Sequence, residues 1–102
     1  MPKTYKKVKP LISLKEFKKR AIKISSFSSS GGQRYKVQSV VGNVMHFIRM
    51  DAKSSRLWDM DLDLVYLAYS ELDDFATINF KPYVPITHSP ARGLLIHLGL
   101  LE

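Results

Sequence analysis

The chain has 102 residues, a formal net charge of +7 at pH 7 and no cysteine, so it is long enough for one domain and excludes disulfides, thiolate metal sites and a cysteine nucleophile. A hydrophobic content of 45% with 25% charged residues is typical of a globular domain and not of a disordered chain. No apolar run has the length of a signal-peptide core or a membrane span, so we expect a cytoplasmic protein that does not contact a membrane.

The charge is distributed unevenly along the chain. Residues 1–36 contain 11 Lys and Arg and a single acid, Glu16, whereas residues 37–102 contain five Lys and Arg and eight acids. Such asymmetry indicates that one part of the molecule binds anions. We expect residues 1–10 to form a basic, flexible tail and residues 11–102 to form a single domain.

A helix is predicted from residue 14 to about residue 25. Ser13 and Glu16 have the spacing of a capping box, in which the Ser hydroxyl accepts from the Glu amide and the Glu side chain reaches back. Leu14 and Phe17 begin an apolar stripe at helical spacing. Lysines recur on another face, where they are usually solvated, but they are also candidates for binding phosphate. These residues are Lys15, Lys18, Lys19 and Lys23.

Residues 25–32 are rich in Ser and Gly and are predicted to be a flexible linker, after which two strands cover residues 34–41 and 44–50. Gly42-Asn43 between the strands favours a two-residue turn of type II′. That turn fixes a register in which Val37 opposes Ile48 on a buried face. The predicted core face consists of Tyr35, Val37, Val41, Val44, Ile48 and Met50. The other, mixed face consists of Lys36, Gln38, Val40, Met45, Phe47 and Arg49.

The same register places Lys36 directly opposite Arg49, which is the strongest sign of a binding surface. Like charges in such positions destabilise a hairpin. Phe47 lies beside Arg49 on the predicted mixed face, and Arg34 is near. Cations with an aromatic ring at hand predict contacts with phosphates and bases. The alternative is that a helix covers Phe47 while the two cations lie at the rim in solvent.

The second half of the chain is predicted to add a short strand at residues 56–60 and two helices. The first helix covers about residues 61–72. The last helix has Ser89 as its N-cap and Pro90 at its first position, and it ends at Gly99. Because this helix is apolar nearly all round, it is either buried or part of an interface, which would allow a homo-oligomer.

The predicted fold class is therefore α+β. We expect a single small domain in which an antiparallel β-hairpin, with or without a third strand, packs with an N-terminal helix and two C-terminal helices.

No motif for catalysis, a cofactor or a metal ion is complete in the sequence. Asp51-Ala-Lys53 matches the acid-x-Lys element of metal-dependent nucleases, but that element needs a second carboxylate on a neighbouring strand, and only Glu16 lies upstream. The histidines show no spacing for a zinc site, and His46 is expected to face the core beside Ser39. We therefore predict no catalytic residue, no metal and no cofactor.

The sequence favours a small, non-enzymatic domain that binds nucleic acid, DNA or RNA, or associates with nucleoprotein, with low sequence specificity. The alternative is an interaction subunit, a helper or inhibitor, that docks on an acidic protein surface through its basic face and its apolar C-terminal helix. A metal-dependent nuclease is a remote third possibility. The predicted binding residues are Lys15, Lys18, Lys19, Lys23, Arg34, Lys36, Phe47 and Arg49.

Overall fold

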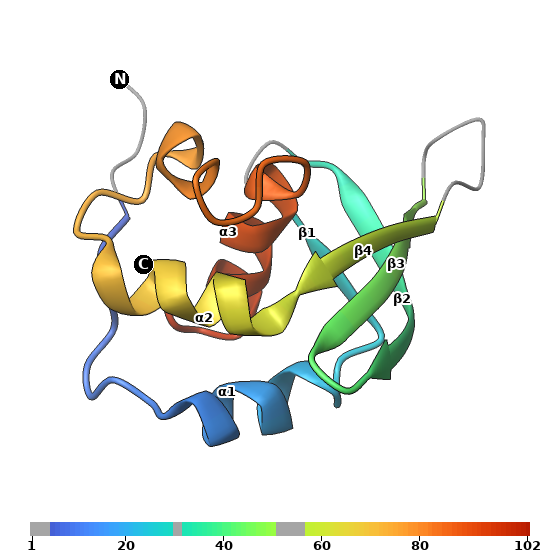
Figure 1. Cartoon of the computed structure of the whole chain (residues 1–102), viewed down its shortest axis with the longest axis horizontal. Coiled ribbons are helices and arrows are strands. Elements are labelled where there is room, and N and C mark those ends of the chain that lie inside the picture. Colours follow the sequence, from blue (N-terminus) through green and yellow to red (C-terminus); the bar gives the residue numbers. More distant parts are fainter. Residues whose placement is uncertain (1–4, 30–31, 51–56) are drawn as a thin grey trace.

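The structure, a computed structural model, describes residues 5–29, 32–50 and 57–102. These residues form a four-stranded antiparallel sheet with the helices on one side of it (Figure 1). The predicted α+β class is confirmed. The elements are α1 (Leu14–Ala21), β1 (Ser26–Ser28), β2 (Arg34–Val41), β3 (Val44–Arg49), β4 (Leu57–Asp61), α2 (Leu62–Glu71), the 3-10 helix η1 (Thr77–Phe80) and α3 (His88–His97).

The strands lie in the sheet in chain order, β1-β2-β3-β4, so each pairs with its neighbours in sequence. The predicted two-residue turn joins β2 and β3. Gly42 has a φ of +62° while Asn43 has no positive φ, which is the combination expected of type II′. The Asn43 carbonyl accepts from the Leu62 amide at 2.7 Å, so this turn is tied to the start of α2.

The register of the hairpin departs from the prediction after its first three pairs. A bulge at Gln38 adds one residue to β2. Lys36 consequently lies opposite Ile48, and Arg49 lies opposite Tyr35. The predicted Lys36–Arg49 pair is wrong, because a two-residue turn fixes the register only as far as the first bulge.

The bulge also determines which face of the hairpin is buried. It allows Tyr35, Val37 and Val40 all to pack in the core, together with Met45 and Phe47 of β3. Met45 and Phe47 are completely buried, so the predicted faces of β3 are exchanged. Four residues that were assigned to the core are instead exposed or half-buried, on the open face of the sheet or just beyond it: Val41, Val44, Ile48 and Met50.

The segment predicted as a linker contains the strand β1. Its only apolar residue, Phe27, is buried, and its ring centroid lies 5.1 Å from that of Tyr35 and 5.5 Å from that of Phe47. The linker prediction is wrong because one aromatic residue between serines supplies the whole contribution of this strand to the core.

Helix α1 ends at Ala21, earlier than predicted, because the chain enters β1 five residues later. The Ser13 hydroxyl accepts from the Glu16 amide at 3.2 Å, as the capping box predicts. The Glu16 carboxylate does not reach back to complete the box; it accepts from Arg20 Nε at 3.1 Å. Lys23 therefore lies beyond the helix, in the connection to β1.

Helix α3 belongs to the core. Ala91, Leu94 and Leu95 are completely buried, so these three residues are not available for contacts with a second copy of the chain. Gly93 touches β1 so closely that a Cβ atom there would lie 2.4 Å from the carbonyl oxygen of Ser28. The apolar character of this helix thus reflects burial, one of its two predicted explanations.

Part of the segment predicted as a tail is paired with the end of the chain. The Lys6 amide donates to the Glu102 carbonyl at 2.8 Å, and the Glu102 amide donates to the Lys6 carbonyl at 2.9 Å. The Val8 amide donates to the Leu100 carbonyl at 2.9 Å, and Lys7 and Leu101 form an isolated bridge between these two paired positions. The first and last described residues consequently lie side by side.

Asp61 joins the sheet to α2, and its loss has a predictable effect. Its carboxylate accepts from the amides of Asp63 and Leu64 and from Asn43 Nδ2, at 2.9, 3.2 and 3.1 Å. Asp61→Ala should lower the free energy of unfolding by about 1–2 kcal/mol, because it removes an N-cap. Urea denaturation measures the change. Asp73→Ala, at an exposed position, serves as the control and should change stability by less than about 0.5 kcal/mol; equal losses would contradict the capping role.

Candidate functional site

The uneven charge along the chain becomes uneven charge in space. α1, β1 and β2 carry cations and a single acid, Glu16, whose carboxylate is bonded to Arg20. Among the described residues, the acids of the second half lie on β4, on α2 and in the turn that follows α2, except for Glu102, which lies beside Lys6. In the sheet, β3 separates β4 from β2. The described cations and acids are therefore concentrated on different elements of the fold.

Three of the four predicted lysines near α1 point into solvent. Lys15, Lys19 and Lys23 are exposed, whereas Lys18 Nζ lies 2.7 Å from Asp63 Oδ1 of α2. Cations in the last turn of a helix stabilise it through the helix dipole, which accounts for part of this pattern without a ligand. It does not account for Lys23, which lies beyond the helix.

Strand β2 carries two further exposed cations. Arg34 and Lys36 are exposed and lie two residues apart, on the open face of the sheet. Lys36 opposes Ser26, which follows Lys23 by three residues, a distance of at most about 10 Å along the backbone. We call the following five residues the basic surface, and none of them has a hydrogen-bond or ion-pair partner among the described residues: Lys15, Lys19, Lys23, Arg34 and Lys36.

Two of the predicted binding residues do not belong to the basic surface. Phe47 is completely buried, with its ring 5.4 Å from that of Tyr35, so it cannot stack on a base, and its assignment to the site is wrong. Arg49 lies on the other side of the sheet, where it lines a cavity with Tyr35 and Trp58 and has contacts of its own. Both errors follow from the bulge that the sequence does not reveal.

His46 also lies on the open face and not in the core. Its Nδ1 atom is 2.6 Å from Asp59 Oδ1 of β4. The prediction that it opposes Ser39 is confirmed, but the bulge turns both residues outward. The Asp59 contact could not be expected from the sequence, because the pairing of β3 with β4 was not predicted.

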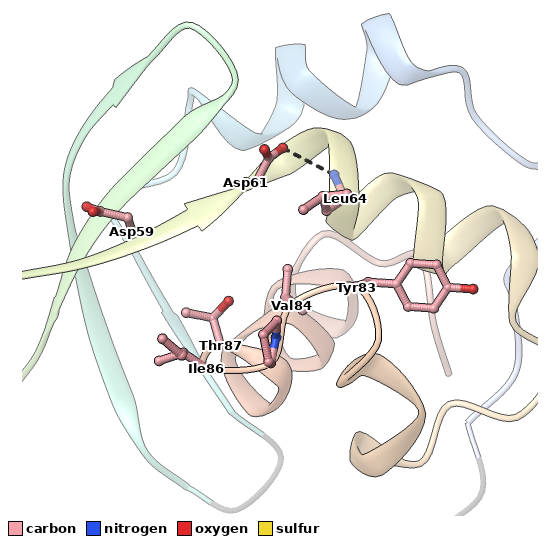
Figure 2. Close-up of a pocket in the computed structure, with 8 residues that line it drawn as sticks. Asp59, Asp61, Leu64, Tyr83, Val84, Ile86 and Thr87 are labelled. Carbon is pink, nitrogen blue, oxygen red and sulfur yellow. Dashed lines mark hydrogen bonds between the residues drawn. The ribbon is translucent and has the colours of Figure 1, made fainter.

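A shallow hollow lies between β4, the start of α2 and residues 83–87 (Figure 2). Figure 2 shows the Asp61 carboxylate turned toward the Leu64 amide, so this acid is engaged in capping. Tyr83 donates to Glu71 Oε1 at 3.1 Å, and desolvation together with this bond raises the pKa of Tyr83. The phenol therefore stays protonated at neutral pH and is unsuited to act as a base.

Asp51 and Lys53, the residues behind the nuclease alternative, lie outside the described residues. Within residues 5–29, 32–50 and 57–102, no three His, Asp or Glu side chains are grouped so as to hold a metal ion. No helix in those ranges combines the length and the apolar character needed to cross a membrane.

No family model matches the sequence, and no curated protein or solved structure is significantly similar to it.

Proposed function

We propose that the protein is a non-enzymatic domain that binds nucleic acid through the phosphate backbone, with low sequence specificity. The observation that carries this proposal is the basic surface, five exposed cations without a partner among the described residues. Neighbouring cations such as Arg34 and Lys36, two residues apart on one face of β2, repel one another in the unbound protein, and a polyanion relieves this repulsion. Each phosphate that they neutralise also releases condensed counterions, which favours binding.

The surroundings of the basic surface favour backbone contacts over base stacking. Phe27, Tyr35 and Phe47 pack on one another in the core, so the open face of β1 to β3 offers cations, hydroxyls and the His46 imidazole but no Phe, Tyr or Trp ring. Contacts from Lys and Arg to phosphate fix the position of a protein on nucleic acid without reading its sequence. Low sequence specificity is the expected consequence.

The open face of the sheet supports a second candidate function, an interaction subunit that docks on an acidic protein. Val41 and Leu57 are 65% and 52% exposed on this face, and Arg34 and Lys36 lie on the same face. A mixed apolar and basic surface suits an acidic protein partner. This candidate no longer includes α3, which is buried.

Salt dependence tests the first function. Binding to a 20-base-pair duplex, measured by fluorescence anisotropy, should weaken with salt with a log–log slope of about −3 to −5, because up to five cations meet phosphates. The double variant Lys19→Gln with Lys36→Gln should flatten the slope by about one to two units and weaken binding to unrelated sequences equally. Lys81→Gln, which removes an exposed cation outside the basic surface, is the matched control and should leave the slope unchanged.

Two results would overturn the proposal. One is the absence of binding to duplex and single-stranded DNA and RNA at low salt. The other is an equal change of the salt-dependence slope in the double variant and in the Lys81 control, which would show that binding depends on net charge alone. In the first case the interaction subunit would remain.

A further inference from the structure

A polar cavity of about 180 Å³ lies where the end of α3 meets β1 and β2. Neither the spacing of residues nor the charge pattern of the sequence indicates it, because it joins residues far apart in the chain. Its lining consists of Ser26, Phe27, Ser28, Arg34, Met50 and His97.

Gly93 explains why His97 reaches the cavity. The helix approaches β1 so closely at Gly93 that only a residue without a side chain fits against Ser28. His97 follows four residues later, which is about one helical turn and about 6 Å along the axis, on the same side of the helix. Because α3 lies so close to β1 at Gly93, the His97 imidazole, one turn later, also lies near this strand.

The cavity is rich in hydrogen-bond donors that no described residue occupies. Arg34 pairs across the sheet with Ser28, and no hydrogen bond or ion pair among the described residues occupies the side chains of Arg34, His97, Ser26 or Ser28. A guanidinium presents a planar fork of N–H groups that matches phosphate oxygens. Ser26, Ser28 and His97, which also line the cavity, have side chains that can donate hydrogen bonds.

The end of α3 does not compete for these donors. Its last carbonyls are occupied: Ile96 O accepts from the Gly99 amide at 3.0 Å, and Leu95 O accepts from the Leu100 amide at 2.9 Å. With these two bonds the helix ends in a Schellman motif, in which Gly99 has a φ of +77°.

The size of the cavity limits what it can hold. Water takes about 30 Å³ in the liquid, so a cavity of about 180 Å³ accommodates a phosphate group with a few waters. Pockets for whole drug-sized ligands are larger, about 300–1,000 Å³. The cavity therefore suits an anionic group and not an entire nucleoside.

We infer that this cavity binds the terminal phosphate of a nucleic-acid strand, an inference that rests on the proposed function. A phosphomonoester carries a charge of about −1.5 to −2 and three acceptor oxygens, whereas an internal diester carries a single charge and two free oxygens. The donor set of the cavity matches the terminal group better. Lys36, opposite Ser26, leads from the cavity to the rest of the basic surface, where the adjoining backbone phosphates lie.

Oligonucleotides of one sequence, with either a 5′-phosphate or a 5′-hydroxyl, test the assignment by fluorescence anisotropy at fixed salt. The 5′-phosphorylated strand should bind about tenfold more tightly, the effect of one charge-assisted set of hydrogen bonds. Arg34→Gln and His97→Gln should each remove most of this preference. Lys19→Gln should weaken both strands equally and keep the preference, and Lys81→Gln should change neither.

The 3′-phosphorylated strand and inorganic phosphate extend the test, the latter followed by amide chemical shifts of Ser26, Ser28 and Arg34. Equal binding of phosphorylated and unphosphorylated strands would overturn the cavity assignment and leave the proposed function standing. Absence of binding by every strand would overturn the proposed function. If no strand binds but inorganic phosphate still shifts these amide signals, the ligand could be a phosphorylated protein. Tight binding of a phosphoserine peptide, abolished by Arg34→Gln, would assign the cavity to such a partner instead.

Discussion

Replacing Phe47 with Ala should lower the free energy of unfolding by about 3–5 kcal/mol, a large part of the stability of a small domain. The side chain is completely buried, and its ring packs edge-on against those of Phe27 and Tyr35 at 5.5 and 5.4 Å. Truncation removes apolar burial and both ring contacts and leaves a cavity among three strands. Urea denaturation followed by circular dichroism measures the loss.

Ile48→Ala is the matched control on the adjacent residue of β3. Ile48 lies on the open face opposite Lys36, so its truncation should cost about 1 kcal/mol, mainly through lower strand propensity. A regular hairpin without the bulge predicts the reverse order of the two effects. Similar large losses at both positions would show that both faces of the sheet are covered, contrary to the fold described here.

Gly93→Ala should destabilise the protein by about 1–3 kcal/mol, although Ala in a helix interior is ordinarily about 1 kcal/mol better than Gly. The new Cβ would lie 2.4 Å from Ser28 O and 2.7 Å from Ser29 Cα. Both are backbone atoms that cannot rotate away, so α3 must move off β1. Thermal and urea denaturation measure the change.

Ser70→Ala, on the exposed side of α2, is the control for helix propensity. It should change stability by less than about 0.5 kcal/mol. The Gly93 variant should also lose the preference for a 5′-phosphate, because the shift of α3 carries His97 away from β1. A Gly93→Ala protein that is as stable as the parent would contradict the close packing of α3 on β1.

The local signals of the sequence predicted the three α-helices and the strands β2, β3 and β4, but not β1. Ser13, the Gly42-Asn43 turn and Gly99 marked the ends of helices and strands through their own backbone chemistry, and all three act there in the structure. The bulge at Gln38 could not be predicted, because it depends on how the inward residues of two strands meet the helices. A single unpredicted residue therefore reversed the faces of the hairpin and the placement of Phe47.

The candidate site was predictable only in its charged part. Lysines at helical spacing and Arg34 beside Lys36 follow directly from the chain, and they form the basic surface. The cavity at the end of α3 depends on tertiary packing, since Gly93 brings His97 to β1 from more than 60 residues away. No local pattern contains that information.

The chain-order arrangement of the strands has a consequence for how the protein folds. Each pairing joins neighbours in sequence, so the entropy lost in closing each loop is small and the sheet can grow from the β2–β3 hairpin strand by strand. The bridge between Lys7 and Leu101 closes a loop that includes nearly the whole chain. It therefore stabilises the protein only after the sheet and the helices have formed. Low contact order in the sheet thus favours a rapid folding reaction, with the junction of the two ends as its last step.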